Sequence, residues 1–242
     1  MGINIAMENL KQDTKDLIGI TLTSYQLSLL EEYEQELDIW NERYSLTAIH
    51  EPEKVRVKHF LDSFSPLLVM KNTPVKKVID VGTGAGFPGI PLKILLPDTE
   101  VVLVDSVNKK TDFCQHIIDH LKLQGISSIH DRVENLAREG EFREQFDWAV
   151  ARAVAQLTTL SEYMLPFVKV GGRMLAMKGD QGPIETQKAA PAISLLGGEL
   201  QQVKRLTLPG VTEDRFLITI EKIAATPEKY PRRVGVPSKK PL

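Results

Sequence analysis

Hydrophobic residues in the first third of the chain recur at helical spacing in two segments. The first segment runs from Ser24, a residue type favoured at a helix N-cap, to Arg43. Its apolar side is formed by Leu27, Leu30, Leu37 and Trp40. The second segment begins at Pro52, which suits the first turn of a helix, and continues to Met70. We predict that these two amphipathic helices form an N-terminal helical cap over residues 1–73.

After Pro74 the hydrophobic pattern changes, and short β-rich runs alternate with helical segments. The predicted strands are residues 77–81, 100–105, 128–134, 147–151 and 173–178. Such alternation is typical of a parallel sheet with crossover helices on both faces. Two further strands, 198–208 and 215–223, are close enough in sequence to pair antiparallel. We therefore predict an α/β domain over residues 74–223, with a mostly parallel, seven-stranded, Rossmann-like sheet.

Composition narrows the class of protein only a little. No apolar run approaches the roughly 20 residues of a membrane span, and the N-terminus does not resemble a signal peptide, so we expect a soluble, cytoplasmic protein. The single cysteine, Cys114, excludes an intramolecular disulfide and a Cys-based zinc site. The five histidines are scattered, and we see no metal-ligand spacing among them. We predict no metal site and no membrane partner.

Charge is uneven along the chain although the formal net charge is only −2. Residues 1–40 carry a net charge of −6, and residues 222–242 carry +5. A basic C-terminal tail, residues 224–242, is suited to contact phosphate groups without making the whole protein basic. A tail that is merely solvated explains the same charges, and composition does not decide between the two.

The stretch VIDVGTGAGFPGIPL, residues 78–92, follows the first predicted strand with glycines that let a ligand approach the backbone. The glycines are Gly82, Gly84, Gly86 and Gly89. A dinucleotide fingerprint, G-x-G-x-x-G, can be aligned from Gly84, but its loop would then begin several residues after the end of the predicted strand. The alternative D-x-G-x-G-x-G begins at Asp80, whose carboxylate would repel a pyrophosphate and attract the ammonium of an amino acid. This register favours S-adenosylmethionine.

The second and third predicted strands supply candidates for binding a nucleoside. Asp105 ends the second strand, and a carboxylate there can accept hydrogen bonds from both ribose hydroxyls of an adenosine. Arg132, Val133 and Glu134 follow near the expected position of the adenine ring. Nicotinamide cofactors use the same features, and a purely structural role for each residue stays open.

The fourth predicted strand offers one cation where an acceptor would arrive. It reads FDWAVARAVAQL and ends near Arg152, without the Pro-Pro-aromatic turn that handles exocyclic amino groups. Cys114 lies in a predicted helix, which argues against a nucleophilic thiol. A ring nitrogen such as guanine N7 already has a free lone pair and needs no general base. Arg152 would hold a phosphate or donate to guanine O6; a structural ion pair is the alternative. Lys178, after the fifth strand, is a further candidate contact or a solvated side chain.

Five motifs together closely resemble the RsmG (GidB) family of bacterial methyltransferases. They are DVGTGAGFPGIPL, LVDSVNKK, ARAVA, GGRMLAMKG and YPRRVGVPSKKPL, within a resemblance that extends from about Trp40 to Leu242. The resemblance implies a class I methyltransferase fold that transfers a methyl group from S-adenosylmethionine to guanine N7 in the 530 loop of 16S rRNA. Ser45 and Ser238 stand where the family usually has Asn, which affects only peripheral RNA contacts.

The resemblance also implies site residues. Cofactor contacts would fall on Gly82, Phe87, Asp105, Ser106, Val107, Val133, Glu134 and Arg152. Candidate RNA contacts are Lys178, Arg232, Arg233, Lys239 and Lys240. His59, Asp62 and Ser63 share one helix face and either border the cleft or form a local polar network. We expect a monomer that acts on 16S rRNA or the small ribosomal subunit. The alternatives are a small-molecule methyltransferase and a non-catalytic ribosome-associated binding protein.

Overall fold

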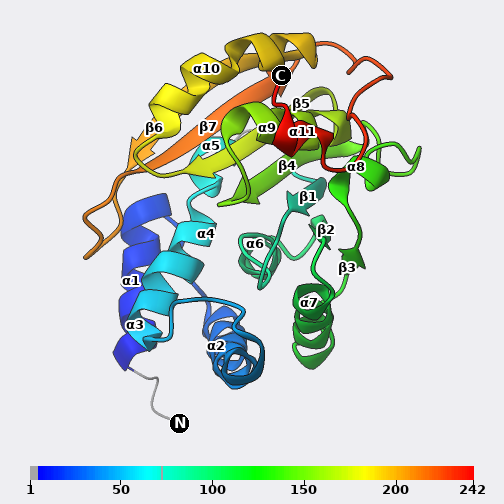
Figure 1. Cartoon of the computed structure of the whole chain (residues 1–242). Coiled ribbons are helices and arrows are strands. Elements are labelled where there is room, and N and C mark those ends of the chain that lie inside the picture. The colour runs from blue at the N-terminus through cyan, green and yellow to red at the C-terminus, as the bar shows by residue number, and fades with distance from the viewer. Residues whose placement is uncertain (1–4, 72) are drawn as a thin grey trace.

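The computed structural model describes residues 5–71 and 73–242, and its N-terminal part contains more helices than the sequence pattern predicted (Figure 1). Helix α1 (Ile5–Ile18) was not predicted, although Met7, Leu10, Thr14 and Ile18 are buried at helical spacing. Helix α2 (Ser24–Tyr44) is capped by Thr23 and not by Ser24. The Thr23 hydroxyl accepts a hydrogen bond from the amide of Gln26, and the Gln26 side chain accepts one from the Thr23 amide.

The second predicted helix is broken into four pieces. They are α3 (Pro52–Val55), the π-helical turn η1 (Arg56–Leu61), α4 (Asp62–Phe64) and α5 (Leu67–Met70). Pro66 explains the break before α5, because proline has no amide hydrogen to continue the helix. The π turn rotates the side chains that follow it, and it carries His59.

The sheet has seven strands in the order β3-β2-β1-β4-β5-β7-β6, and β7 runs antiparallel to the two strands beside it, β5 and β6. The strands are β1 (Lys77–Val81), β2 (Glu100–Asp105), β3 (Ile126–His130), β4 (Phe146–Arg152), β5 (Val168–Lys178), β6 (Gly198–Leu206) and β7 (Arg215–Lys222). The third strand was predicted too late in the chain. Asp131 ends it by accepting hydrogen bonds from the Arg132 amide and the Asn135 side chain, so Val133 and Glu134 begin a short helix, α8 (Val133–Leu136).

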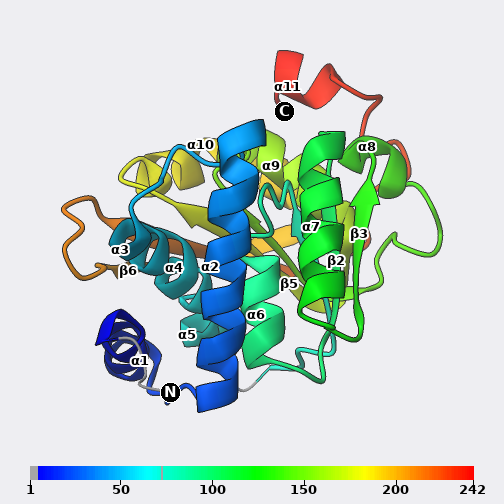
Figure 2. The same ribbon diagram turned by 90° about the horizontal axis from the view of Figure 1, so that it is seen from below.

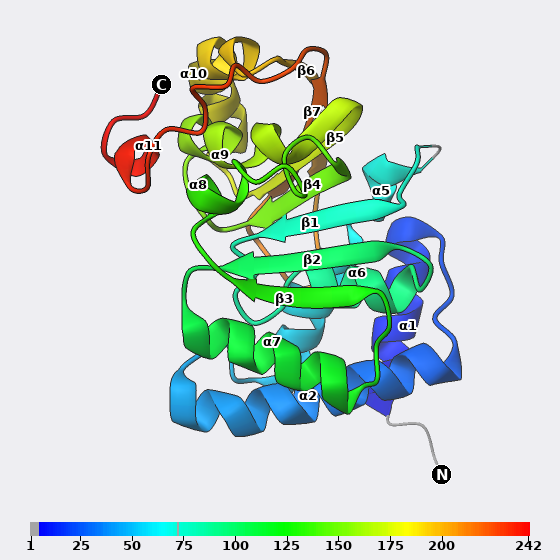
Figure 3. The ribbon, with the colours of Figure 1, turned by 90° about the vertical axis from the view of Figure 1, so that its right-hand side faces the viewer.

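Helices cover both faces of the sheet (Figures 1 and 3). One face carries α6 (Gly89–Leu95), α7 (Asn108–His120) and the N-terminal helices, and the other carries α8, α9 (Leu157–Met164) and α10 (Gly182–Leu195). A hydrophobic cluster on the first face joins Leu30 of α2 to Val78 of β1 and Phe113 of α7. The N-terminal helices therefore share a core with the sheet. Among the described residues, no helix is both long and apolar enough to cross a membrane.

The C-terminal segment folds back onto the second face as an ordered part of the structure. It contains the buried Tyr230 and the short helix α11 (Val236–Lys239), which packs against α9 (Figure 1). Arg232 forms an ion pair with the fully buried Glu162 of α9, at 2.6 Å between Nη2 and Oε2. The expectation of a merely solvated tail is thus wrong for this part of it.

Candidate active site

The glycine loop, residues 82–89, lies at the carboxyl end of β1, where the order of the sheet reverses between β1 and β4. This is the position at which open α/β sheets bind ligands. Gly82 has a φ of +68°, and a Cβ there would lie 2.6 Å from a methyl carbon of Val154. A Cβ at Gly84, with a φ of +62°, would meet no atom within 4 Å. Gly86 makes room for Tyr33, whose hydroxyl would lie 2.6 Å from its Cβ.

Asp80 holds this loop together from below. Its Oδ2 accepts hydrogen bonds from the Thr83 hydroxyl at 2.7 Å and the Gly89 amide at 2.8 Å. Burial raises the pKa of the Asp80 carboxyl to about 6, although both hydrogen bonds and the charge of Arg152 oppose this shift. The carboxyl is fully buried and lines neither cavity described below. The predicted contact of Asp80 with a ligand ammonium is therefore corrected: Asp80 orders the backbone of the loop.

Two cavities adjoin at the carboxyl ends of the strands and share Gly82, Lys110 and Ala153. The smaller has a volume of about 350 Å³ and includes Asp105, Ser106, Val107, Val133 and Glu134 in its lining. The larger, about 480 Å³, includes Gly84, Phe87, Arg152 and Lys178. Most of the predicted cofactor residues thus lie on one continuous surface. Asp80 and Gly86 do not line either cavity, because Asp80 is buried beneath the loop and Gly86 is buried within it.

Asp105 connects the two cavities. Its Oδ1 accepts from the Val107 amide at 2.9 Å, and its Oδ2 accepts from the Gly84 amide at 3.0 Å. Each carboxylate oxygen keeps a lone pair, so both can still accept a hydrogen bond from a hydroxyl pair such as that of ribose. The bond to Gly84 also ties the Asp105 carboxylate to the glycine loop.

Glu134 has a structural partner that the sequence did not reveal. Its side chain is buried, and its Oε1 accepts a hydrogen bond of 2.9 Å from the amide of Gly235 in the C-terminal segment. This contact brings Ser238 to the lining of the smaller cavity, together with Tyr163. The expectation that Ser238 affects only peripheral RNA contacts is therefore wrong, and Tyr163 was not predicted because nothing local in the sequence links it to β3.

Phe87, at the tip of the loop, is packed between two other rings. The His59 ring stacks on it with centroids 4.6 Å apart, and the Tyr33 ring does so at 5.3 Å. The Tyr33 hydroxyl also donates a short hydrogen bond to the Ala85 carbonyl. Phe87 is buried but also lines the larger cavity. It therefore packs against its neighbouring rings and borders the space open to a ligand.

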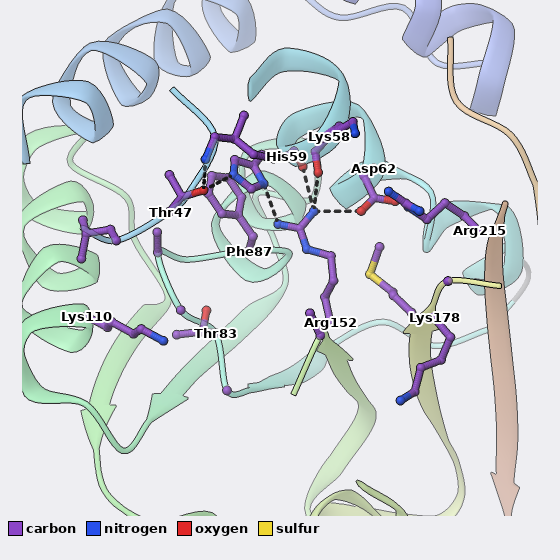
Figure 4. Close-up of a pocket in the computed structure, with 18 residues that line it drawn as sticks. Thr47, Lys58, His59, Asp62, Thr83, Phe87, Lys110, Arg152, Lys178 and Arg215 are labelled. Carbon is purple, nitrogen blue, oxygen red and sulfur yellow. Dashed lines mark hydrogen bonds and ion pairs between the residues drawn. The ribbon is translucent and has the colours of Figure 1, made fainter. Parts of the chain in front are cut away.

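Arg152 ends β4 and is held by several groups of the π turn and α4 (Figure 4). Its Nη1 donates to Asp62 Oδ2 at 2.9 Å and to the Lys58 carbonyl at 3.0 Å. Its Nη2 lies 3.2 Å from His59 Nδ1, and the guanidinium carbon lies 5.2 Å from the centre of the Phe87 ring. The side chain is 14% exposed and lines the larger cavity. The structural ion pair considered as an alternative is therefore present.

His59 is the neutral member of this cluster. Burial and the charge of Arg152 lower the pKa of His59 to about 3. With Nδ1 facing the Arg152 donor, Nε2 carries the proton and donates to the Thr47 hydroxyl at 2.8 Å. The two alternatives considered for His59 and Asp62 both hold, because these residues form a local polar network and also line the larger cavity. Ser63 is fully buried and lines neither cavity.

Cationic side chains outnumber carboxylates in the lining of the larger cavity, although four of these cations pair with carboxylates. Its lining has five cationic side chains and one carboxylate, Asp62; the cations are Lys58, Lys110, Arg152, Lys178 and Arg215. Lys178 is not solvated: it is 10% exposed, pairs with Glu185 at 2.7 Å and donates to the Ala155 carbonyl. Lys58 and Arg215 were not predicted, because only the fold brings them to the end of β4. Such a surface favours an anionic acceptor.

Two predictions about reactive groups have different outcomes. Cys114 is buried, burial raises the pKa of its thiol, and the thiol donates to the Gly84 carbonyl at 3.5 Å, so it is not an available nucleophile. The prediction that no histidines have metal-ligand spacing is wrong. His116 and His120 lie four residues apart on α7, and their ring nitrogens lie within 4.8 Å of each other and of a Glu36 carboxylate oxygen.

Comparisons with known proteins agree with this geometry. The family model GidB, described as rRNA small subunit methyltransferase G, matches residues 26–215. The ribosomal RNA small subunit methyltransferase G of Macrococcus caseolyticus is 47% identical over 93% of this chain and 94% of its own. The protein of the same description from Desulfitobacterium hafniense is 44% identical over 95% of both chains.

Solved structures resemble the fold at low sequence identity. TrmN from Thermus thermophilus superimposes with a TM-score of 0.53 and 20% identity, covering 67% of this chain and 48% of that one. TYW2 from M. jannaschii, solved in complex with AdoMet, gives a TM-score of 0.50 and 17% identity, covering 63% and 72%. At these identities the likeness concerns the fold alone.

Proposed function

This chain belongs to the GidB family, rRNA small subunit methyltransferase G, and from that premise we propose that it methylates guanine N7 in the 530 loop of bacterial 16S rRNA. It is an S-adenosylmethionine-dependent rRNA methyltransferase with a class I fold. The observation that carries the proposal is the pair of adjoining cavities, one with a ribose-binding carboxylate and the other lined with cations.

The residues present fit S-adenosylmethionine. Asp105 keeps lone pairs for the ribose hydroxyls, and Val107 and Val133 line the smaller cavity where an adenine ring would lie. Gly82 and Gly84 offer bare backbone toward the larger cavity for the amino-acid end. When bound, the cofactor supplies an electrophilic methyl group. The chain contributes binding, orientation and the exclusion of water.

The acceptor side needs positioning more than proton transfer. Guanine N7 has its own lone pair. The lowered pKa of His59 makes it a weak base and the Cys114 thiol is buried, so both are consistent with a reaction that uses no general base. Arg152, fixed by Asp62 and His59, presents a cation at a defined place in the cavity lining. We assign it the positioning of the acceptor, by contact with a phosphate or guanine O6.

RNA contacts outside the cavity are proposed for exposed cations of the tail. Arg233, Lys239 and Lys240 are exposed, whereas Arg232 is committed to Glu162 and is removed from the set. A monomer that binds 16S rRNA or the small ribosomal subunit stays a prediction.

The experiment is to incubate the purified protein with labelled S-adenosylmethionine and either free 16S rRNA or small ribosomal subunits, and then to map the methylated nucleotide. We expect N7-methylguanine in the 530 loop with at least one of the two substrates. Label in another nucleotide, or in neither substrate while the protein binds cofactor, would contradict the proposal.

A further inference from the structure

Helices α2 and α7 lie side by side on the outer side of the molecule (Figures 2 and 3). Two carboxylates of α2 face two imidazoles of α7. His116 and His120 are one turn apart on α7, and Glu32 and Glu36 are one turn apart on α2. His116 Nε2 lies 2.6 Å from Glu36 Oε2, and His120 Nε2 lies 3.6 Å from Glu32 Oε2. None of the four lines the two cavities of the active site.

The donor atoms already converge. One ligand atom each from Glu36, His116 and His120 lies within 4.8 Å of the others. A tetrahedral Zn²⁺ ion with bonds of about 2.1 Å separates its ligand atoms by roughly 3.4 Å, so small side-chain rotations suffice to close the site. Imidazole nitrogen and carboxylate oxygen are both zinc ligands, and residues four apart on a helix present them on one face.

The surroundings orient the histidines and leave the site open to solvent. The His116 ring packs against Trp40 with centroids 5.0 Å apart and against the His120 ring at 5.7 Å. The side chains of His116 and His120 are 35% and 39% exposed, and that of Glu36 is 19% exposed. An ion can therefore enter from solvent, and Glu32, at 49% exposed, is within reach as a fourth ligand.

Hydrogen bonds between the imidazoles and carboxylates alone would account for the pairs, one histidine to one glutamate. They do not account for the meeting of three donor atoms from two helices at one point. We propose that Glu36, His116 and His120, with Glu32 as the fourth ligand, bind a Zn²⁺ ion that links α2 to α7. The ion is structural. It joins an N-terminal helix to the helix that follows the donor-site residues Asp105–Val107 in the chain.

The test is calorimetric titration of ZnCl₂ into the untagged, full-length protein after treatment with EDTA and desalting. We expect one equivalent to bind and each of Glu36→Gln, His116→Gln and His120→Gln to weaken binding by about tenfold or more, since each removes a ligand. The matched controls are Glu42→Gln, an exposed carboxylate of α2, and His50→Gln, an exposed histidine outside the cluster. Both should bind zinc like the wild type. Equal binding by the wild type and a His116→Gln, His120→Gln double variant overturns the proposal.

Two further measurements separate a built site from loose association. Co²⁺ in the wild type should give the strong visible absorption of tetrahedral coordination, and the weak absorption of an octahedral, hydrated ion would contradict the proposed ligand set. Saturating Zn²⁺ should raise the melting temperature by about 5 °C or more in the wild type but not in His120→Gln. An equal rise in both proteins also overturns the proposal. Methylation should survive chelation, because the ion takes no part in the chemistry; its loss with cofactor binding intact would refute a structural role.

Discussion

The Arg152 side chain satisfies three acceptors at once: the Asp62 carboxylate, the Lys58 carbonyl and the His59 ring. A lysine at this position keeps the charge but has no planar fork with which to reach all three. Removal of the guanidinium also leaves a buried carboxylate without its cation. The three acceptors therefore fix where the Arg152 guanidinium lies, in addition to balancing its charge.

We accordingly expect Arg152→Lys and Arg152→Ala both to reduce the single-turnover rate of rRNA methylation by about tenfold or more, at saturating cofactor and RNA. The control is Arg173→Lys, at a residue of β5 that lies over Trp148 and pairs with Glu221, outside the cavity. A wild-type rate for Arg152→Lys would mean that charge suffices. Unaltered chemistry with lost cofactor binding would reassign Arg152 to the donor.

His59 gives the protein a distinct dependence of stability on pH. The pKa of His59 is 6.5 in its ordinary state and about 3 in the folded protein, so the unfolded chain takes up a proton first as the pH falls. Its contribution to stability is present above pH 6.5 and is lost as the pH falls from 6.5 toward 3. Asp80 has the opposite sign: its pKa is raised to about 6, so its contribution is present below 3.8 and is lost as the pH rises through 6.

Comparison with a His59→Gln variant isolates this effect. Between pH 7 and pH 5 the wild type should lose roughly 2 kcal/mol more of its free energy of unfolding than the variant does. Urea unfolding at the two pH values measures the difference, with the exposed His130→Gln as the control. Identical losses in the wild type and His59→Gln would show that His59 is not buried in its neutral form.

At the scale of elements, the glycine loop is fixed by contacts from three sides: Asp80 below it, Asp105 of β2 beside it and Tyr33 of α2 above its tip. Gly84 is the position where the loop stays open. A side chain there would point into free space that belongs to the larger cavity. The same lack of side chain serves packing at Gly82 and Gly86 and leaves room for a ligand at Gly84.

Gly84→Val should therefore weaken S-adenosylmethionine binding by about tenfold or more in a protein that still folds. Gly210 supplies a matched control, because it has a φ of +65° and no atom within 4 Å of an added Cβ, but lies in the turn between β6 and β7. Gly210→Val carries the same backbone strain and should leave calorimetric cofactor affinity unchanged. Equal affinities for both variants would argue against the loop as the cofactor site.

The elements that could be predicted from sequence are those whose pattern is local. The limits of β1 and β2 match the prediction, because each strand is a short apolar run with a carboxylate at or next to its last residue. The late end predicted for β3 and the unbroken helix predicted after Pro52 were wrong. Hydrogen bonds to the Asp131 side chain end the strand, and a π turn interrupts the helix. Asp105 and Arg152 could be predicted as site residues because each lies at or next to the end of a predicted strand. The partners of Arg152 lie some ninety residues earlier, and only the fold brings them together.

At the scale of the whole molecule, the two ends of the chain have opposite charges and different relations to the site. The acidic N-terminal helices pack on one face of the sheet, and the basic tail folds over the other (Figure 1). Four cations of the tail stay exposed: Lys229, Arg233, Lys239 and Lys240. Arg232 is instead bound to the buried Glu162.

Replacement of Arg233, Lys239 and Lys240 by alanine should weaken rRNA binding. The slope of the logarithm of the binding constant against the logarithm of the salt concentration should become shallower by about 0.7 to 0.9 for each lost phosphate contact. Cofactor affinity should change little. Arg232→Ala should instead lower stability by about 3 kcal/mol, because it removes the cation from the buried Glu162 carboxylate and leaves only the hydrogen bond from the backbone amide of residue 232. Salt titrations of RNA binding and urea unfolding measure the two effects. An unaltered salt slope in the triple variant would show that these cations do not contact RNA.

The contact between Glu134 and Gly235 also has a consequence for biosynthesis. These residues are 101 positions apart in the chain, and Ser238, which lines the smaller cavity, follows Gly235 closely. During translation the glycine loop, Asp105 and Glu134 all leave the ribosome well before residues 230–238 are made. A nascent chain can therefore form β1 through β4 before it can complete the Gly235 side of the smaller cavity, so we expect full affinity for the cofactor only after residues 230–238 have left the ribosome.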